Sequence, residues 1–199
     1  MRYESFRQYI RLYPVTTAIL LIQVVLFVLM TWLGSSTDEE TLLRFGAMLN
    51  VPPYSGEYWR YFAAIFLHIG FNHLLFNSFS IFVFAPPLER LLGAWRYAVF
   101  YLGSGLAGNL VSELLTRDVH LSAGASGAIY GVFGAYLYIA LFRKSAIDKQ
   151  SSVTIKAVLV VGIIYSFLMP NVNWYAHLGG LAAGMLLFRQ LIHKSRTNQ

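Results

Sequence analysis

The sequence contains no cysteine, and charged residues make up only 12% of its 199 residues, whereas 57% are hydrophobic. Without cysteine the chain can form neither a disulfide framework nor a thiolate metal site, and it cannot use a cysteine nucleophile. A typical soluble domain carries about 25% charged residues. So few charges cannot cover the surface of a water-soluble protein of this length, and the composition therefore indicates a membrane protein.

Charge is also absent from five long stretches of the sequence. No Asp, Glu, Lys or Arg occurs in 12–37, 61–88, 97–112, 119–142 or 157–188. A membrane-spanning helix needs about 20 mostly apolar residues, and the last stretch is long enough for two helices separated by residues 170–173. We therefore predict an all-α membrane protein, with one domain over residues 1–199 and six spanning helices. Their predicted ranges are 14–33, 71–88, 94–115, 125–142, 153–169 and 175–192, with Pro86-Pro87 closing the second helix and 34–70 forming an outer loop.

Acidic residues are fewer than basic ones, nine against fifteen, and the two kinds are unevenly distributed. Six spanning helices place both termini and two loops on one side, which then holds 12 of the 15 basic residues. Because cytoplasmic loops of membrane proteins are enriched in Lys and Arg, we expect this side to be cytoplasmic in a multi-pass protein of the plasma membrane. No basic stripe is interleaved with exposed aromatic residues, so the sequence does not indicate a nucleic-acid partner.

Polar side chains are scarce in the predicted helices, and those present gather near the outer ends of three of them. Helices two, four and six run in the same direction, so their first residues lie at one depth. The second helix opens with His68, His73 and Asn77, the fourth with Ser126, and the sixth with His177. Polar groups at membrane depth cost free energy, which favours a functional role for them.

Each of these features also has a purely structural interpretation. His73 and Asn77 share a helix face and could hydrogen-bond to another helix. A serine such as Ser126 at the start of a helix is typical of an N-cap. Metal binding is less well supported, because His68 and His73 are five residues apart, diverge on a helix, and have no carboxylate nearby.

Considered together, the polar residues suit nucleophilic catalysis. A nucleophile needs a base within hydrogen-bond reach, and an oxyanion needs donors about 3 Å away. The GxxxG motif Gly180/Gly184 would pack the sixth helix against the fourth, so that His177 reaches Ser126. No Asp or Glu is placed to orient His177, so we expect a dyad. The Tyr130 ring, one turn after Ser126, would pack on the imidazole instead.

The sequence resembles the rhomboid intramembrane serine proteases over nearly its whole length. The matching motifs are Trp59-Arg60, His68-x4-His73-x3-Asn77, Glu89-Arg90-x2-Gly93, Gly124-x-Ser126-Gly127 with Tyr130, and Ala176-His177-x-Gly179-Gly180 with Gly184. The resemblance implies a six-helix rhomboid-like bundle with Ser126 as nucleophile and His177 as general base. It implies His73 and Asn77 as oxyanion-hole donors, together with the Ser126 amide.

The same resemblance assigns roles outside these catalytic positions. His68 would serve the outer loop and its water network, Trp59 and Arg60 would stabilise that loop, and 170–175 would form a gate with the fifth helix. The implied substrates are single-span membrane proteins, cut near the outer face of the bilayer beside a small residue. No metal or other cofactor is implied.

Two other functions stay open from the residues alone. A small transporter could use the same polar side chains as a pathway, although a transport site usually lies near the midplane. Here the polar cluster lies near one face, and the cytoplasmic half offers no polar relay. A non-catalytic protein that binds transmembrane helices would not depend on Ser126 or His177.

Overall fold

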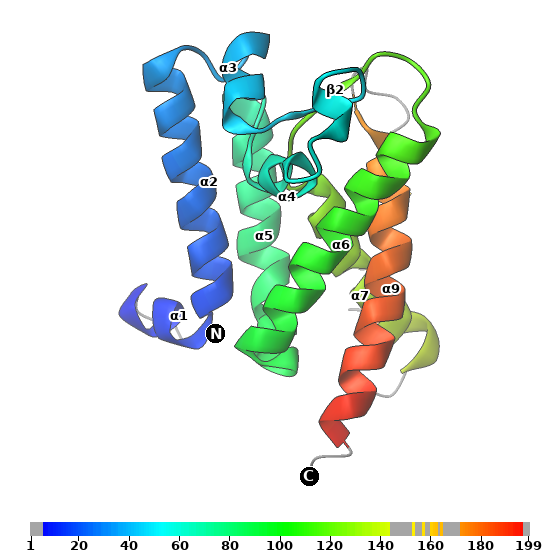
Figure 1. Ribbon diagram of the computed structural model, residues 1–199. Helices are drawn as coiled ribbons and strands as arrows, with labels where there is room; N and C mark the ends of the chain where they lie inside the picture. Colours follow the sequence, from blue (N-terminus) through cyan, green and yellow to red (C-terminus); the bar gives the residue numbers. More distant parts are fainter. Residues whose placement is uncertain are drawn as a thin grey trace.

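The computed structural model describes residues 6–143, 153, 157, 160–162, 164 and 172–196, and it is built mainly from helices (Figure 1). The long helices are α2 (Pro14–Leu33), α5 (Phe71–Leu92), α6 (Ala94–Leu115), α7 (Ser126–Phe142) and α9 (Trp174–Arg196). Helices are thus present at five of the six predicted ranges. The predicted fifth helix, 153–169, lies mostly outside the described residues.

Two of the described helices, α2 and α6, are long and apolar enough to cross a membrane. A third crossing is α5, if it is counted with the preceding segment Arg60–Phe66, from which it bends by 87°. The apolar α7 is shorter. The six predicted crossings therefore stay a prediction, while the helical, membrane-type character of the chain is evident.

The two ends of the bundle are formed by different segments of the chain. The short helix α1 (Phe6–Leu12) and the C-terminal end of α9 lie at the lower end in Figure 1, while α3 (Glu39–Phe45) and α4 (Arg60–Ala63) lie at the upper end. Helices α5, α7 and α9 all run downward from that upper end. Their first residues therefore lie at one end of the bundle, as expected from the sequence.

The outer loop 34–70 is folded onto the upper end of the bundle. Besides α3 and α4 it contains β1 (Met48–Leu49), η1 (Tyr54–Gly56) and η2 (Ala64–Phe66). The η2 side chains are almost completely buried, and β1 pairs antiparallel with β2 (Leu121–Ser122), which directly precedes α7. These short elements were not predicted, because their positions depend on contacts with α2, α6 and the segment before α7 rather than on local periodicity.

Helix α3 has a clear start signal in the loop. Asp38 accepts hydrogen bonds from the hydroxyl of Thr41 at 2.7 Å and from its backbone N–H at 2.8 Å. These two bonds lower the pKa of Asp38, because they favour the charged carboxylate. The cap holds the first turn of α3 in place at the upper end of the bundle.

The predicted end of the second helix at Pro86-Pro87 is wrong, since α5 continues through both prolines to Leu92. Proline removes a helix hydrogen bond, but the residues beyond it are held by tertiary contacts. Leu88 and Glu89 are 1% and 2% exposed. The Glu89 carboxylate accepts bonds from the backbone N–H groups of Val15 and Thr16, both at 2.8 Å.

Polar side chains are also buried in the lower part of the bundle. From the sequence we expected no chain of polar groups in this half. The buried side chains include Thr16, Gln23, Glu89, Tyr97 and Tyr101. The Glu89 carboxylate has a structural role, because it accepts a hydrogen bond from the Thr16 hydroxyl at 2.6 Å in addition to the two backbone bonds. It thereby caps the N-terminus of α2, where a negative charge is favourable.

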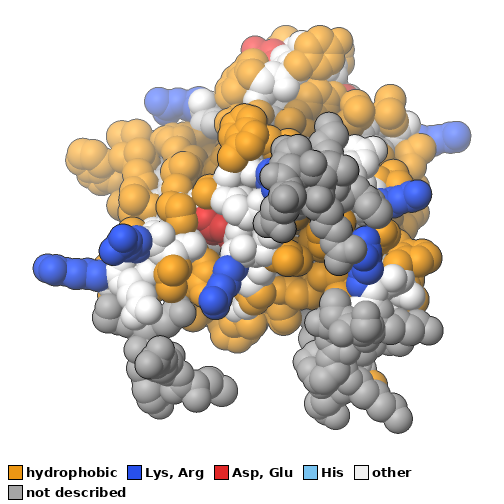
Figure 2. All heavy atoms as spheres, turned by 90° about the horizontal axis from the view of Figure 1, so that it is seen from below, with side chains coloured by type: hydrophobic (Ala, Val, Ile, Leu, Met, Phe, Trp, Pro, Cys, Tyr) orange, Lys and Arg blue, Asp and Glu red, His pale blue; other side chains and the backbone are white. Residues whose placement is uncertain are grey.

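Basic side chains surround the lower end of the bundle. Figure 2, which views this end, shows Lys and Arg side chains projecting around a largely hydrophobic face. The described arginines of the segments that end or begin there are Arg7, Arg11, Arg90, Arg96, Arg143 and Arg189. These six arginines, part of the twelve basic residues predicted for one side, therefore lie at one end of the bundle.

Candidate active site

Ser126 is presented at the upper end of the bundle by a segment anchored on the outer loop. β2 pairs with β1, and the Gly124 N–H donates to the carbonyl of Ala64 at 2.9 Å. Ser126 is the first residue of α7, whose N-cap is Ala125. The N-cap interpretation of Ser126 is therefore not supported, and its own amide is among the first four of the helix, which have no intrahelical partner.

His177 lies in the first turn of α9 and is 6% exposed. The Tyr130 ring stacks on its imidazole, with ring centroids 4.1 Å apart and planes 10° from parallel. This packing is the one expected from the spacing of Tyr130 and Ser126 on one helix face. An aromatic ring in this position restricts the rotation of the imidazole, as a carboxylate would in a triad.

Small residues bring the helices of Ser126 and His177 into backbone contact. A Cβ at Gly180 would overlap the carbonyl oxygen of Gly127, and one at Gly184 would overlap that of Gly131. A Cβ at Gly127 would lie 3.5 Å from the carbonyl oxygen of Ala176. The residue after Ser126 therefore faces the residue before His177, and the packing role predicted for the glycines is observed.

Among the described residues, no hydrogen bond joins Ser126 to His177. Catalytic hydrogen bonds are often long or poorly aligned until substrate is bound. The two side chains belong to neighbouring helix starts that are in backbone contact.

His73 approaches the segment that precedes Ser126. A Cβ at Gly124 would lie 2.7 Å from Cε1 and 2.9 Å from Nε2 of His73, and Gly124 has a φ of +154°. Only glycine fits this close approach and this backbone conformation. Asn77 follows one turn later, and its Nδ2 donates to the His73 carbonyl at 3.0 Å. This bond lies within α5, and among the described residues no hydrogen bond joins Asn77 to another helix, the structural alternative considered for it.

His68 is fully buried beside His73, with ring centroids 5.2 Å apart. The expected divergence of the two rings is wrong, because α5 begins at Phe71 and His68 lies before it. In the described parts of the chain, no group of three His, Cys, Asp or Glu side chains is arranged to hold a metal ion. His68 thus lies where the outer loop meets the start of α5.

Trp59 and Arg60 fasten the outer loop. The buried Arg60 guanidinium donates from one nitrogen to the carbonyls of Leu43 at 2.6 Å and Ala47 at 3.0 Å, and it pairs with Glu57 at 2.5 Å. The Trp59 ring covers Gly46, where a Cβ would lie 2.5 Å from it. Both residues therefore contact the turn that joins α3 to β1.

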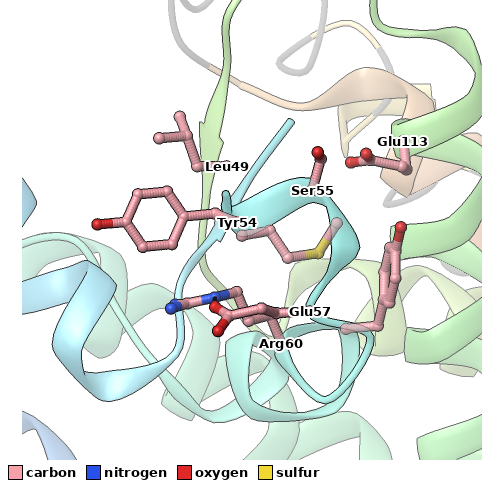
Figure 3. A pocket seen from close by; sticks show the side chains of 8 residues that line it. Leu49, Tyr54, Ser55, Glu57, Arg60 and Glu113 are labelled. Atoms are coloured by element: carbon pink, nitrogen blue, oxygen red, sulfur yellow. Dashed lines mark hydrogen bonds and ion pairs between the residues drawn. The ribbon is translucent and has the colours of Figure 1, made fainter. Parts of the chain in front are cut away.

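A small polar hollow lies in this loop, away from Ser126. Figure 3 shows Ser55 and Glu113 pointing into it from η1 and α6, with the Arg60–Glu57 pair below. Met48, Leu49, Tyr54 and Tyr61 complete its lining. It contains none of the residues predicted to carry out catalysis.

Two asparagines that the sequence did not single out hold the segments around Ser126 and His177. Asn50 accepts the His120 N–H at 2.7 Å and donates to the Asp118 carbonyl at 2.8 Å. Asn173 accepts the Ala176 N–H at 3.0 Å, the pattern of a helix N-cap. For Asn173, the only local signal in the sequence was its position just before the sixth predicted helix. Asn50 had no such signal.

Comparison with known proteins places these residues in a family. The Rhomboid domain model matches residues 55–194. The YdcA protein of Bacillus subtilis (strain 168), named as a candidate rhomboid protease, is 43% identical over 190 residues, covering 94% of this chain and 93% of its own length. The rhomboid protease GluP of the same organism is 36% identical over 163 residues, covering 82% of this chain and 32% of GluP.

More distant relatives share the same region. RHOMBOID-like protein 1 of Arabidopsis thaliana is 34% identical over 149 residues, covering 74% of this chain and 38% of that protein. The chain thus spans about a third of GluP and of the plant protein, and nearly all of YdcA. With the family model covering most of the chain and a relative matched along almost its entire length, this membrane-embedded chain belongs to the rhomboid family of intramembrane serine proteases.

Proposed function

We propose that the chain is an intramembrane serine endopeptidase that cleaves single-span membrane proteins through a dyad of Ser126 and His177. The observation that carries the proposal is the convergence of three helix starts at the upper end of the bundle. Tyr130 stacks on His177, while His73 presses against Gly124, two residues before Ser126. One membrane domain supplies all of these groups.

The chemistry follows from the residue types. Ser126 Oγ attacks the scissile carbonyl carbon while His177 accepts the hydroxyl proton. The resulting oxyanion receives hydrogen bonds from the Ser126 amide and from the side chains of His73 and Asn77. When the C–N bond breaks, protonated His177 returns the proton to the leaving amine. A water molecule, deprotonated by His177, then hydrolyses the acyl-enzyme and restores Ser126.

The substrate class follows from the location of the dyad. The helix starts lie at the end of the bundle opposite the six arginines of the lower end. We assign the arginine-rich end to the cytoplasmic side of a plasma membrane. A substrate helix hides its carbonyls in hydrogen bonds, so it must unwind near the outer face before cleavage. Helix-breaking residues in the substrate lower the cost of that unwinding.

The test is cleavage of a reporter with one transmembrane helix by the purified protein in liposomes. Wild type is expected to cut the reporter, and Ser126→Ala and His177→Ala are expected to abolish cleavage. Asn77→Ala is expected to lower the rate by about 10²–10³, the usual cost of one oxyanion donor. A fluorophosphonate probe should label Ser126 alone.

A matched control is Thr31→Ala, which removes an exposed hydroxyl that donates only to the Phe27 carbonyl of its own helix. This variant should cleave at the wild-type rate. Unchanged cleavage by Ser126→Ala would overturn the dyad and favour a protein that binds transmembrane helices without cutting them.

A further inference from the structure

One asparagine side chain joins three separate elements above the proposed dyad. Asn173 Nδ2 donates to Ser112 Oγ of α6 at 2.5 Å and to Ser122 Oγ of β2 at 3.1 Å. Its Oδ1 accepts the Ala176 N–H of α9 at 3.0 Å. A single amide group therefore links α6, the segment before α7, and the start of α9.

Two of the linked residues, Ser122 and Asn173, are equally far in sequence from the two proposed catalytic residues. Ser122 precedes Ser126 by four residues, and Asn173 precedes His177 by four. The Asn173 carbonyl also accepts the His177 N–H at 3.2 Å. Asn173 is thus bonded both to the segment that leads to Ser126 and to His177 itself.

The contact with Ser112 attaches Asn173 to a buried position on α6. Ser112 is 3% exposed in α6, and α6 packs against both α7 and α9. Within the described part of the predicted gate segment 170–175, Asn173 is thus attached to the body of the bundle. An amide side chain suits these three contacts, because it offers two N–H donors and a carbonyl acceptor on one short side chain.

We propose that Asn173 is a positioning residue that sets the separation of Ser126 and His177. The proposal rests on the proposed dyad. A misplacement of about 1 Å between reacting groups can cost about 10² in rate, so a link of this kind controls kcat rather than substrate binding. Capping of α9 alone would need only the Oδ1 contact.

The variants separate positioning from capping. Asn173→Ser keeps a hydroxyl acceptor, which serves as an N-cap, but is too short to reach Ser112 and Ser122. The double variant Ser112→Ala/Ser122→Ala keeps Asn173 and removes its two acceptors. Thr31→Ala is the control for loss of a remote hydroxyl. Each protein is assayed in liposomes for kcat and KM, for the rate of fluorophosphonate labelling at Ser126, and for its unfolding temperature.

Asn173→Ser and the double variant are expected to unfold close to the wild-type temperature. Their kcat and labelling rate should fall by about ten- to hundredfold with little change in KM. Wild-type rates in both proteins would overturn the proposal, as would losses of activity that occur only in variants with a lowered unfolding temperature. Absence of cleavage by the wild type, or unchanged cleavage by Ser126→Ala, would instead overturn the proposed function.

Discussion

At the residue scale, the chain orients its proposed base with an aromatic ring. His177 is buried, and the parallel Tyr130 ring lies 4.1 Å from it. Aromatic pairs of this kind contribute about 0.5–1.5 kcal/mol beyond the area they bury. The stacking therefore supplies an orienting interaction of useful size where the sequence offers no carboxylate.

Two replacements of Tyr130 should distinguish the contribution of its ring from that of its hydroxyl. Tyr130→Ala is expected to lower kcat by about three- to tenfold, the rate equivalent of losing the stacking energy. Tyr130→Phe retains the ring and should lose less activity. Cleavage kinetics in liposomes measure both, and equal losses in the two variants would contradict a role for the ring.

At the scale of elements, the contact between α7 and α9 depends on missing side chains. A methyl group at Gly184 would overlap both the carbonyl oxygen and the Cα of Gly131. Overpacking of a close contact costs about 1–3 kcal/mol. Gly184→Ala should therefore lower the unfolding temperature in detergent and reduce cleavage. Gly56→Ala is the matched control, because its added Cβ meets nothing within 4 Å.

The cap on α2 is a second interaction between elements. Glu89→Ala would leave two backbone donors of α2, on Val15 and Thr16, without their acceptor. Hydrogen bonds to charged groups contribute about 1.5–3 kcal/mol each, so the unfolding free energy should fall by about 3 kcal/mol. Glu89→Gln should lose less. Since Glu89 lies at the opposite end of α5 from His73, the folded protein should keep its kcat; a large fall in kcat at full folding would contradict this assignment.

Much at this scale could be predicted from apolar runs. The ranges 14–33 and 94–115 match α2 and α6 at both ends, because the lengths of these runs match what a bilayer requires. The end of α5 could not be predicted, since Glu89 is held past Pro86-Pro87 by bonds to a helix more than 70 residues earlier. The short elements of the outer loop depend in the same way on remote partners.

At the scale of the whole molecule, charge separates the two ends. Tyr58, 76% exposed in the upper loop, and Trp95, 78% exposed at the start of α6, mark the opposite ends. The chain has no cysteine, so Tyr58→Cys and Trp95→Cys each introduce a single thiol. With a membrane-impermeant maleimide, Tyr58→Cys should react in right-side-out vesicles, and Trp95→Cys only in inside-out vesicles. The reverse pattern would contradict the assigned orientation.

The sequence by itself determined the composition suited to a bilayer, the ranges of α2 and α6, the uneven distribution of charge, and which polar residues lie near helix starts. These properties are local or periodic, so residue order is enough to show them. Only the tertiary structure decided that His73 lies against Gly124 and that Asn173 joins α6, β2 and α9. Those contacts join residues far apart in the chain, and close packing of glycine-lined helices is what brings them together.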